Sequence, residues 1–202
     1  MKREIEIRYI IRRNGAYFGS LQPIGAPQLR CDDSSALKMS LSGDFAPNEL
    51  ADWLRDEIQP VLVLDGVEYP LAVLMPATVT PKKTATTASL HIEAYDRCWR
   101  VQTRCAESLR YFAQGLNYLN VIVSLLTDAG ITSVAKVNTA HTLVEDREDW
   151  NIGTSNLAIV NELLAEINYK QLWFDQDGAA RLEPAAQAKA ENIQHIFDDT
   201  NV

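Results

Sequence analysis

Two tight-turn dipeptides, Asn14-Gly15 and Asp65-Gly66, determine how the first hundred residues can fold. Residues 61–64 (VLVL) precede the second dipeptide and residues 67–71 (VEYPL) follow it. Both dipeptides tolerate the positive φ angles of a type I′ turn, whose twist matches the twist of the flanking antiparallel strands. The sequence therefore predicts two β-hairpins, and antiparallel β structure around them.

Period-two alternation of apolar and polar residues predicts further strands in this region. The expected strands lie at residues 4–10, 16–18, 37–42, 73–79 and 89–94. We expect a polar loop at residues 81–84, and a short helix at residues 47–57 with Asn48 as cap and Leu50, Trp53, Leu54 and Ile58 on one face. Strands at this spacing indicate a small antiparallel β-barrel or sandwich, which we assign to residues 1–102.

Helical spacing replaces the alternation from about residue 95. A short helix is expected at residues 96–100, and longer ones at residues 117–129, ended by Gly130, and 155–167, capped near Ser155. A closing hairpin is expected across residues 172–182. The sequence therefore predicts an α+β domain over residues 103–184. Residues 185–202 read as a linker and, at 192–199, the first strand of a further domain, so we expect the natural polypeptide to continue.

The net charge of −8 lies entirely in residues 141–202, which have 4 Lys and Arg against 12 Asp and Glu. Such an acidic surface repels phosphate backbones, so we expect no nucleic-acid binding. The basic residues among the first thirteen could form a nucleic-acid arm, but solvated faces of an edge strand are favoured: Lys2, Arg3, Arg8, Arg12 and Arg13. Because no apolar run reaches about 18 residues, we expect a soluble protein, made in the cytoplasm, that does not enter a membrane.

The densest cluster of chemically competent side chains is the carboxylate run at residues 145–149 (EDRED), which follows His141. It could bind a divalent cation or supply the two carboxylates of a glycosidase. Arg147 interrupts the run, and neighbouring acids on one loop do not face each other across a cleft. We therefore favour a solvated loop, and regard the pairs at residues 32–33 and 198–199 as more ordinary still.

Other catalytic and metal-binding patterns are missing from the sequence. It contains no phosphate-binding loop, no HExxH motif and no GxSxG motif. The three cysteines, Cys31, Cys98 and Cys105, form no CxxC pair, and His91, His141 and His195 are dispersed, so reduced structural thiols are expected. We expect no catalytic, cofactor-binding or metal-binding residue, and a protein that is not an enzyme.

Each of the four tryptophans lies beside apolar periodic positions, so core anchoring is favoured for all of them: Trp53, Trp99, Trp150 and Trp173. The alternative is a stacking platform for a sugar or a base, which requires interleaved basic residues. Residues 97–100 (RCWR) come nearest to that pattern.

Several segments resemble the N-terminal half of bacteriophage and prophage tail baseplate hub proteins. Residues 52–71 (DWLRDEIQPVLVLDGVEYPL) and 92–96 (IEAYD) are similar to the first tail-tube-like β domain of that family. Residues 146–150 (DREDW), 153–155 (GTS) and 163–169 (LLAEINY) look like the α+β domain that follows it. These motifs are structural signatures without a catalytic pattern.

The resemblance implies a structural adaptor in the virion tail, synthesised in the bacterial host cytoplasm, that joins the tail tube to the tip or spike. It implies other tail proteins as partners, including the tube or distal tail protein and the tape measure. Such hubs are trimers with two tube-like domains per subunit, so we expect a trimer for a longer natural chain and a monomer or weak dimer for these 202 residues. The alternatives are a tail-associated cell-wall hydrolase and a carbohydrate-binding module.

Overall fold

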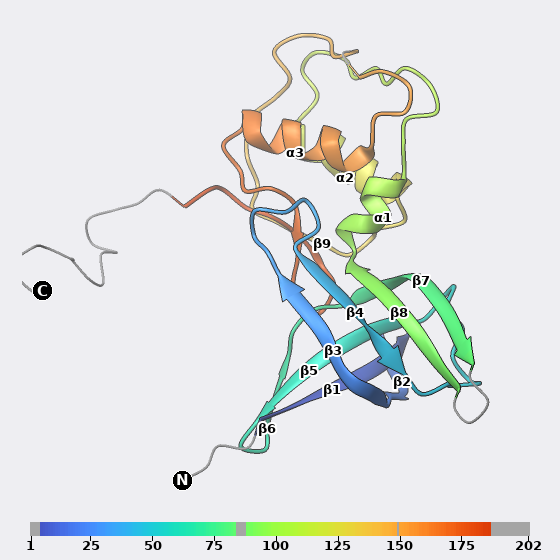
Figure 1. Cartoon of the computed structure of the whole chain (residues 1–202). Helices are drawn as coiled ribbons and strands as arrows, with labels where there is room; N and C mark the ends of the chain where they lie inside the picture. Colours follow the sequence, from blue (N-terminus) through green and yellow to red (C-terminus); the bar gives the residue numbers. More distant parts are fainter. Residues whose placement is uncertain (1–4, 84–87, 149, 187–202) are drawn as a thin grey trace, which may run out of the picture.

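The computed structural model describes residues 5–83, 88–148 and 150–186 and shows an α+β protein made mostly of antiparallel sheet (Figure 1). Residues 5–83 and 88–96 form a large curved sheet, which we call the sheet part. Residues 98–148 and 150–186 form three helices and a small second sheet at one end of the first, which we call the helical part. The basic residues Lys2 and Arg3 and the strand expected at 192–199 lie outside the described residues, as does the linker beyond residue 186.

Eight strands pair in the sheet part in the order β2-β1-β5-β7-β8-β4-β3, with β6 paired to β5 beside this path. Their bounds are β1 Ile5–Arg13, β2 Ala16–Leu21, β3 Pro23–Cys31, β4 Met39–Phe45, β5 Glu57–Leu64, β6 Val67–Pro70, β7 Leu74–Lys83 and β8 Ala88–Asp96.

Both predicted hairpins are confirmed. Asn14 and Gly15 have φ angles of 52° and 79° between β1 and β2, and Asp65 and Gly66 have 49° and 83° between β5 and β6. Left-handed backbone at both turn positions is what an Asn-Gly or Asp-Gly pair accommodates with least strain.

The expected barrel is not formed, because the sheet is not closed. The two strands at the ends of the order, β2 and β3, are halves of one bent segment joined through Gln22. Antiparallel neighbours need a turn of about two residues between them, so these halves cannot form a hairpin with each other. They pair instead with β1 on one side and β4 on the other.

Strand β3 was not predicted, because Pro23, Gly25 and Pro27 all disfavour a regular strand. The structure accommodates them with an irregularity between Ile24 and Gln28, where Gly25 has a φ angle of 80°. Gly43 of β4 lies directly under this site, since a Cβ there would stand 2.5 Å from the Pro27 Cβ.

The helix expected at residues 47–57 is wrong; this segment forms turns and leads into β5 at Glu57. Side-chain oxygens within the segment accept its backbone N–H groups instead. The Oδ1 atom of Asn48 accepts the Leu50 N–H at 3.0 Å, and that of Asp52 accepts the Leu54 N–H at 3.2 Å. Such side-chain bonds compete with a helix, and they leave Leu54 96% exposed.

The polar loop expected at residues 81–84 is also wrong in part, since residues 81–83 belong to β7 and pair with β8. Strand β5 meets β7 only at the Ile58–Leu74 pair, so most of the other edge of β7 has no β5 partner in the described residues. Proline is tolerated on such an edge, which explains why Pro81 does not end the strand.

The helical part contains α1 Cys98–Thr103, α2 Tyr118–Asp128, β9 Val134–Lys136, α3 Asn156–Glu166, β10 Trp173–Phe174 and β11 Ala180–Leu182. The three expected helices are confirmed. The Asn117 Oδ1 atom accepts the Leu119 N–H at 3.0 Å to cap α2, and the Ser155 Oγ atom accepts the Ala158 N–H at 3.2 Å to cap α3. Gly130, with a φ angle of 77°, follows the end of α2.

The closing hairpin of β10 and β11 is confirmed as well, but its third strand was not predicted. Strand β9 pairs in parallel with β11, so the small sheet has the order β10-β11-β9. Three residues are too few for an alternation to be visible in the sequence.

Two hydrophobic clusters form the interior. The first lies inside the sheet part, around Ile11, Phe45 and Ile92. The second lies between the helices, and it includes Cys98 and Val101 of α1 as well as Ile122 of α2. The domain boundary near residue 102 stays a prediction. Across residues 5–83, 88–148 and 150–186, the helices are too short or too polar to span a bilayer.

Candidate functional site

The carboxylates of Glu145, Asp146 and Glu148 do not converge on one point. Glu145 and Glu148 are exposed, and Asp149 lies outside the described residues. The Asp146 Oδ1 atom accepts the Gln114 N–H at 2.8 Å, so this carboxylate holds the loop before α2. Within the part of the chain that the structure describes, no three His, Cys, Asp or Glu side chains are arranged to hold a metal ion.

Arg147, which interrupts the run, is the best-connected residue of this loop. Its guanidinium donates to Glu166 at 2.7 Å and to Glu162 at 2.8 Å, and its Cζ lies 4.9 Å from the centre of the Trp150 ring. The Trp150 indole N–H donates to Glu162 at 2.9 Å. Arg147 and Trp150 therefore fix the loop to α3, a structural role that was not predicted from the sequence.

Two of the four tryptophans pack in or against the hydrophobic clusters. Trp150 is buried in the second cluster, and Trp53 is partly buried against the first. Trp99 is half-buried on α1, and Trp173 is half-buried in β10 beside a cleft. Three of the basic residues near the N-terminus are paired: Arg8 with Glu6 and Glu68, Arg13 with Asp56, and Arg12 with the Gly15 carbonyl.

The cysteines and histidines do not form a reactive group. The Cys98 thiol is buried beside Asp96, and burial raises its pKa far above the ordinary value. Cys31 is exposed. The His91 Nδ1 atom lies 2.7 Å from Asp44, whose pKa is held below its usual range by hydrogen bonds from Lys82 and His91. His141 is exposed, and His195 lies outside the described residues.

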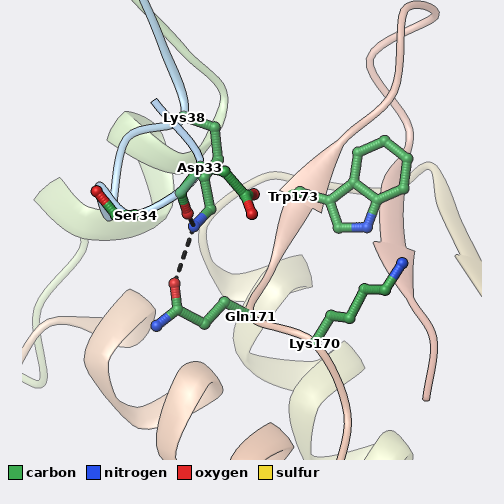
Figure 2. Close-up of a pocket in the computed structure, with 6 residues that line it drawn as sticks. All are labelled: Asp33, Ser34, Lys38, Lys170, Gln171 and Trp173. Atoms are coloured by element: carbon green, nitrogen blue, oxygen red, sulfur yellow. Dashed lines mark hydrogen bonds between the residues drawn. The ribbon is translucent and has the colours of Figure 1, made fainter. Parts of the chain in front are cut away.

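Figure 2 shows a cleft of about 410 Å³ between the β3–β4 connection and β10, lined by Asp33, Ser34, Lys38, Lys170, Gln171 and Trp173. Its two lysines and Gln171 already have partners, whereas the buried Trp173 indole N–H has none among the described residues. The Lys38 ammonium donates to the Asp33 carbonyl at 2.5 Å and to Gln171 Oε1 at 2.9 Å, and Lys170 is paired with Glu183 at 2.8 Å. This cleft therefore joins the sheet part to the helical part through a polar contact.

A stronger tie lies at Arg97, between β8 and α1. Its Nε and Nη2 atoms donate to the two oxygens of Glu57 at 2.8 and 2.7 Å, and its Nη1 atom donates to the Gly178 carbonyl at 2.5 Å. Beside it, the Gln59 side-chain amide donates to the Gln176 carbonyl at 2.6 Å. Sequence reasoning missed both ties, since their partners are forty or more residues away.

Three strands of the sheet part extend together as an arm. It consists of residues 5–8 of β1, 61–64 of β5 and 67–70 of β6, at the end of the sheet away from the helices (Figure 1). Strand β2 pairs only with residues 9–13 of β1, so in the described residues this stretch of β1 has β5 as its sole neighbour.

One face of the arm carries no charge and is almost entirely apolar. The register joins Ile5, Leu64 and Val67 in one row across the three strands, and Ile7, Leu62 and Tyr69 in the next. Residues two apart on a strand share a face, so these side chains form one surface, the arm face. It consists of Ile5, Ile7, Leu62, Leu64, Val67 and Tyr69.

The opposite face of the arm is charged. Arg8 donates to Glu6 at 3.2 Å and to Glu68 at 2.9 Å, across three strands. Val61 and Val63, which share this face, are buried. Long charged side chains can cover apolar neighbours with their methylene stems while their charged ends stay in water. The back of the arm is therefore already covered, and the arm face is not.

Comparison with known proteins gives a likeness in structure. No protein-family model and no curated protein sequence matches the chain. A tail protein from Neisseria meningitidis MC58 superposes with a TM-score of 0.60 over 87% of this chain, at 12% identity. The 43 kDa tail protein of prophage MuSo2 from Shewanella oneidensis superposes with a TM-score of 0.62 over 92% of this chain, at 10% identity. The chain spans 50% and 55% of these two proteins, so it shares the fold of about half of each.

Proposed function

We propose that this chain is a structural component of a bacteriophage or prophage tail, and that it acts as a baseplate hub adaptor between the tail tube and the tip or spike. The observation behind the proposal is the fold: two tail proteins share it over nearly the whole of this chain. The resemblance of residues 52–71 to hub proteins supports the same assignment.

In this proposal, residues 1–102 act as the tube-like domain and residues 103–184 as the domain that connects it to neighbouring tail proteins. The tube or distal tail protein, the tip or spike and the tape measure are the proposed partners. A trimer is the proposed assembly of a longer chain with two tube-like domains. The proposed role is structural: of the carboxylates weighed for catalysis, Glu145 and Glu148 are exposed to solvent, and Asp146 accepts the Gln114 N–H.

Immunogold electron microscopy tests this assignment. An epitope-tagged copy would be expressed in the lysogenic bacterium that carries the gene, the prophage induced, and tails purified and labelled. We expect label at one end of each tail, where tube and tip meet. Label along the whole tube, or none on intact tails, contradicts the hub role. Deletion of the gene should yield tube-defective or tipless particles, and a tagged wild-type copy should restore them.

A further inference from the structure

A second cleft, of about 360 Å³, lies between the sheet part and the helical part. The β1–β2 turn, the residues that lead into β5 and the start of β7 form one wall, and α1 and the loop between α2 and β9 form the other. Among the described residues that line it, three are arginines, Arg55, Arg97 and Arg100, and one is a carboxylate, Glu57. The cleft is therefore positively charged, whereas the chain has a net charge of −8.

Two of the three guanidinium groups are not engaged in a close ion pair. The charges of Arg97 and Glu57 cancel in their own pair. The Arg55 side chain is 81% exposed, and its Nε atom lies 3.7 Å from Asp52, beyond hydrogen-bond distance. The exposed Arg100 guanidinium donates to no acceptor in residues 5–83, 88–148 and 150–186. Each wall of the cleft therefore presents one guanidinium whose donors can bind a ligand.

Arg100 is nevertheless held in place. Its guanidinium lies against Gly130, where a Cβ atom would stand 2.9 Å from Nη2 and 3.1 Å from Cζ. Gly178 receives Arg97 in the same way, since a Cβ there would stand 2.8 Å from the Arg97 Cζ. Arg97 then binds Glu57, whereas Arg100 has no acid to bind. The C-terminal end of α2 attracts a cation to Gly130, but this attraction leaves the N–H donors of Arg100 unused.

We propose that this cleft binds an acidic segment of another protein chain through two carboxylates, one on each wall. A guanidinium donates two parallel N–H bonds to a carboxylate, so Arg55 and Arg100 are matched to that group. The volume lies within the roughly 300–1,000 Å³ of ligand pockets, and Thr132 and Ser133, which also line the cleft, carry hydroxyl donors. A long polyanion such as a nucleic acid is disfavoured, because the chain as a whole is negative. This inference goes beyond the tail role and does not depend on it.

Nuclear magnetic resonance of the full 202-residue chain tests the proposal, because the Nε–H groups of arginines can be observed directly. The probe is the peptide acetyl-Gly-Glu-Glu-Ser-Glu-Glu-Gly-amide, and the matched control peptide has glutamine in place of each glutamate. The Nε–H signals of Arg55 and Arg100 should shift saturably with the acidic peptide, with a dissociation constant of about 0.1–1 mM, since exposed ion pairs are weak. The control peptide should cause no shift, and added salt should weaken the binding of the acidic peptide severalfold.

Three variants separate the cleft from the general charge of the protein. Arg100→Gln and Arg55→Gln should each weaken peptide binding about tenfold. Lys83→Gln removes an exposed cation outside the cleft and should leave binding unchanged. Thermal melting of each variant would show that it remains folded.

Inorganic phosphate distinguishes a peptide site from a site for a free anion. It should bind at least about tenfold more weakly than the peptide, because one ion does not pair with both walls as two linked carboxylates do. Phosphate binding as tight as peptide binding overturns the proposal. The absence of a saturable shift at about 10 mM peptide overturns it too, as does peptide binding that both arginine variants retain.

Discussion

Replacing Arg97 by methionine tests how the two parts of the molecule are held together. Methionine keeps most of the unbranched apolar stem and removes the guanidinium. The Glu57 carboxylate would then lose both of its hydrogen bonds from Arg97, and the Gly178 carbonyl would lose its donor. The Arg97 and Glu57 side chains are only 20% and 15% exposed, so water could not fully replace the lost partners.

The expected loss of stability follows from that burial. Removing one partner of a buried ion pair costs about 3–5 kcal/mol, and residual access of water to Glu57 lowers this to about 2–4 kcal/mol. In a chain of this size the melting temperature should fall by roughly 5–12 °C. Arg8 is the matched control: it also donates to glutamate carboxylates, those of Glu6 and Glu68, but its side chain is 50% exposed, so Arg8→Met should cost much less than Arg97→Met.

The stability of both variants would be measured by urea denaturation, followed by far-ultraviolet circular dichroism and tryptophan fluorescence, and by differential scanning calorimetry. The double variant Arg97→Met/Glu57→Gln should be less destabilised than the two single changes added together, because no orphan carboxylate remains. If Arg97→Met costs no more than Arg8→Met, the tie contributes nothing and the reasoning is wrong.

Three further predictions use other parts of the structure. Hydrogen bonds, first of all from Arg110, lower the pKa of Asp128 to about 2. The ionised Asp128 therefore stabilises the fold fully above about pH 4, and this contribution is lost as the pH falls towards 2. The difference in unfolding free energy between wild type and Asp128→Asn, measured by urea titration, should vanish over that range. Ile122→Ala should cost about 2–5 kcal/mol in the second cluster, whereas Leu54→Ala, in the segment without a helix, should change stability by less than about 0.5 kcal/mol; equal effects in denaturation would contradict the fold described for residues 47–57. The buried Cys98 thiol should resist maleimide in the native protein and react only at the rate of unfolding, which mass spectrometry of labelled peptides would show; fast native labelling would be inconsistent with its burial.

The sequence predicted the elements whose stabilising contacts are local. The two hairpins depend on the dipeptides at their turns, and α2 and α3 depend on the caps Asn117 and Ser155 and on apolar spacing. The same rule explains the false helix at 47–57. Its apolar spacing was real, but Asn48 and Asp52 bind the backbone locally and stop a helix from forming.

Features that depend on distant residues could not be predicted. In the sequence, Arg97 is one more charged residue in a predicted short helix. Only the folded structure shows that it bonds Glu57 and Gly178. The alternation of apolar and polar residues in β1 and β5 was visible in the sequence. Which of their apolar side chains stay exposed depends on where β2 stops pairing with β1, at Leu21. That position is set by the unpredicted bent segment of β2 and β3, and so the arm face was not predicted either.

The central place of the first strand has a consequence for biosynthesis. Strand β1 lies between β2 and β5, and its residue Ile11 pairs with Ile58, near the middle of the first hundred residues. As the chain leaves the ribosome, the β1–β2 hairpin has to wait for β5, and β4 has to wait for β8, its partner on the side away from β3. Pairing over such long sequence separations is slow, and the apolar strands stay exposed meanwhile. Translation pauses before residue 57 should therefore lower the yield of folded protein more than pauses after residue 96.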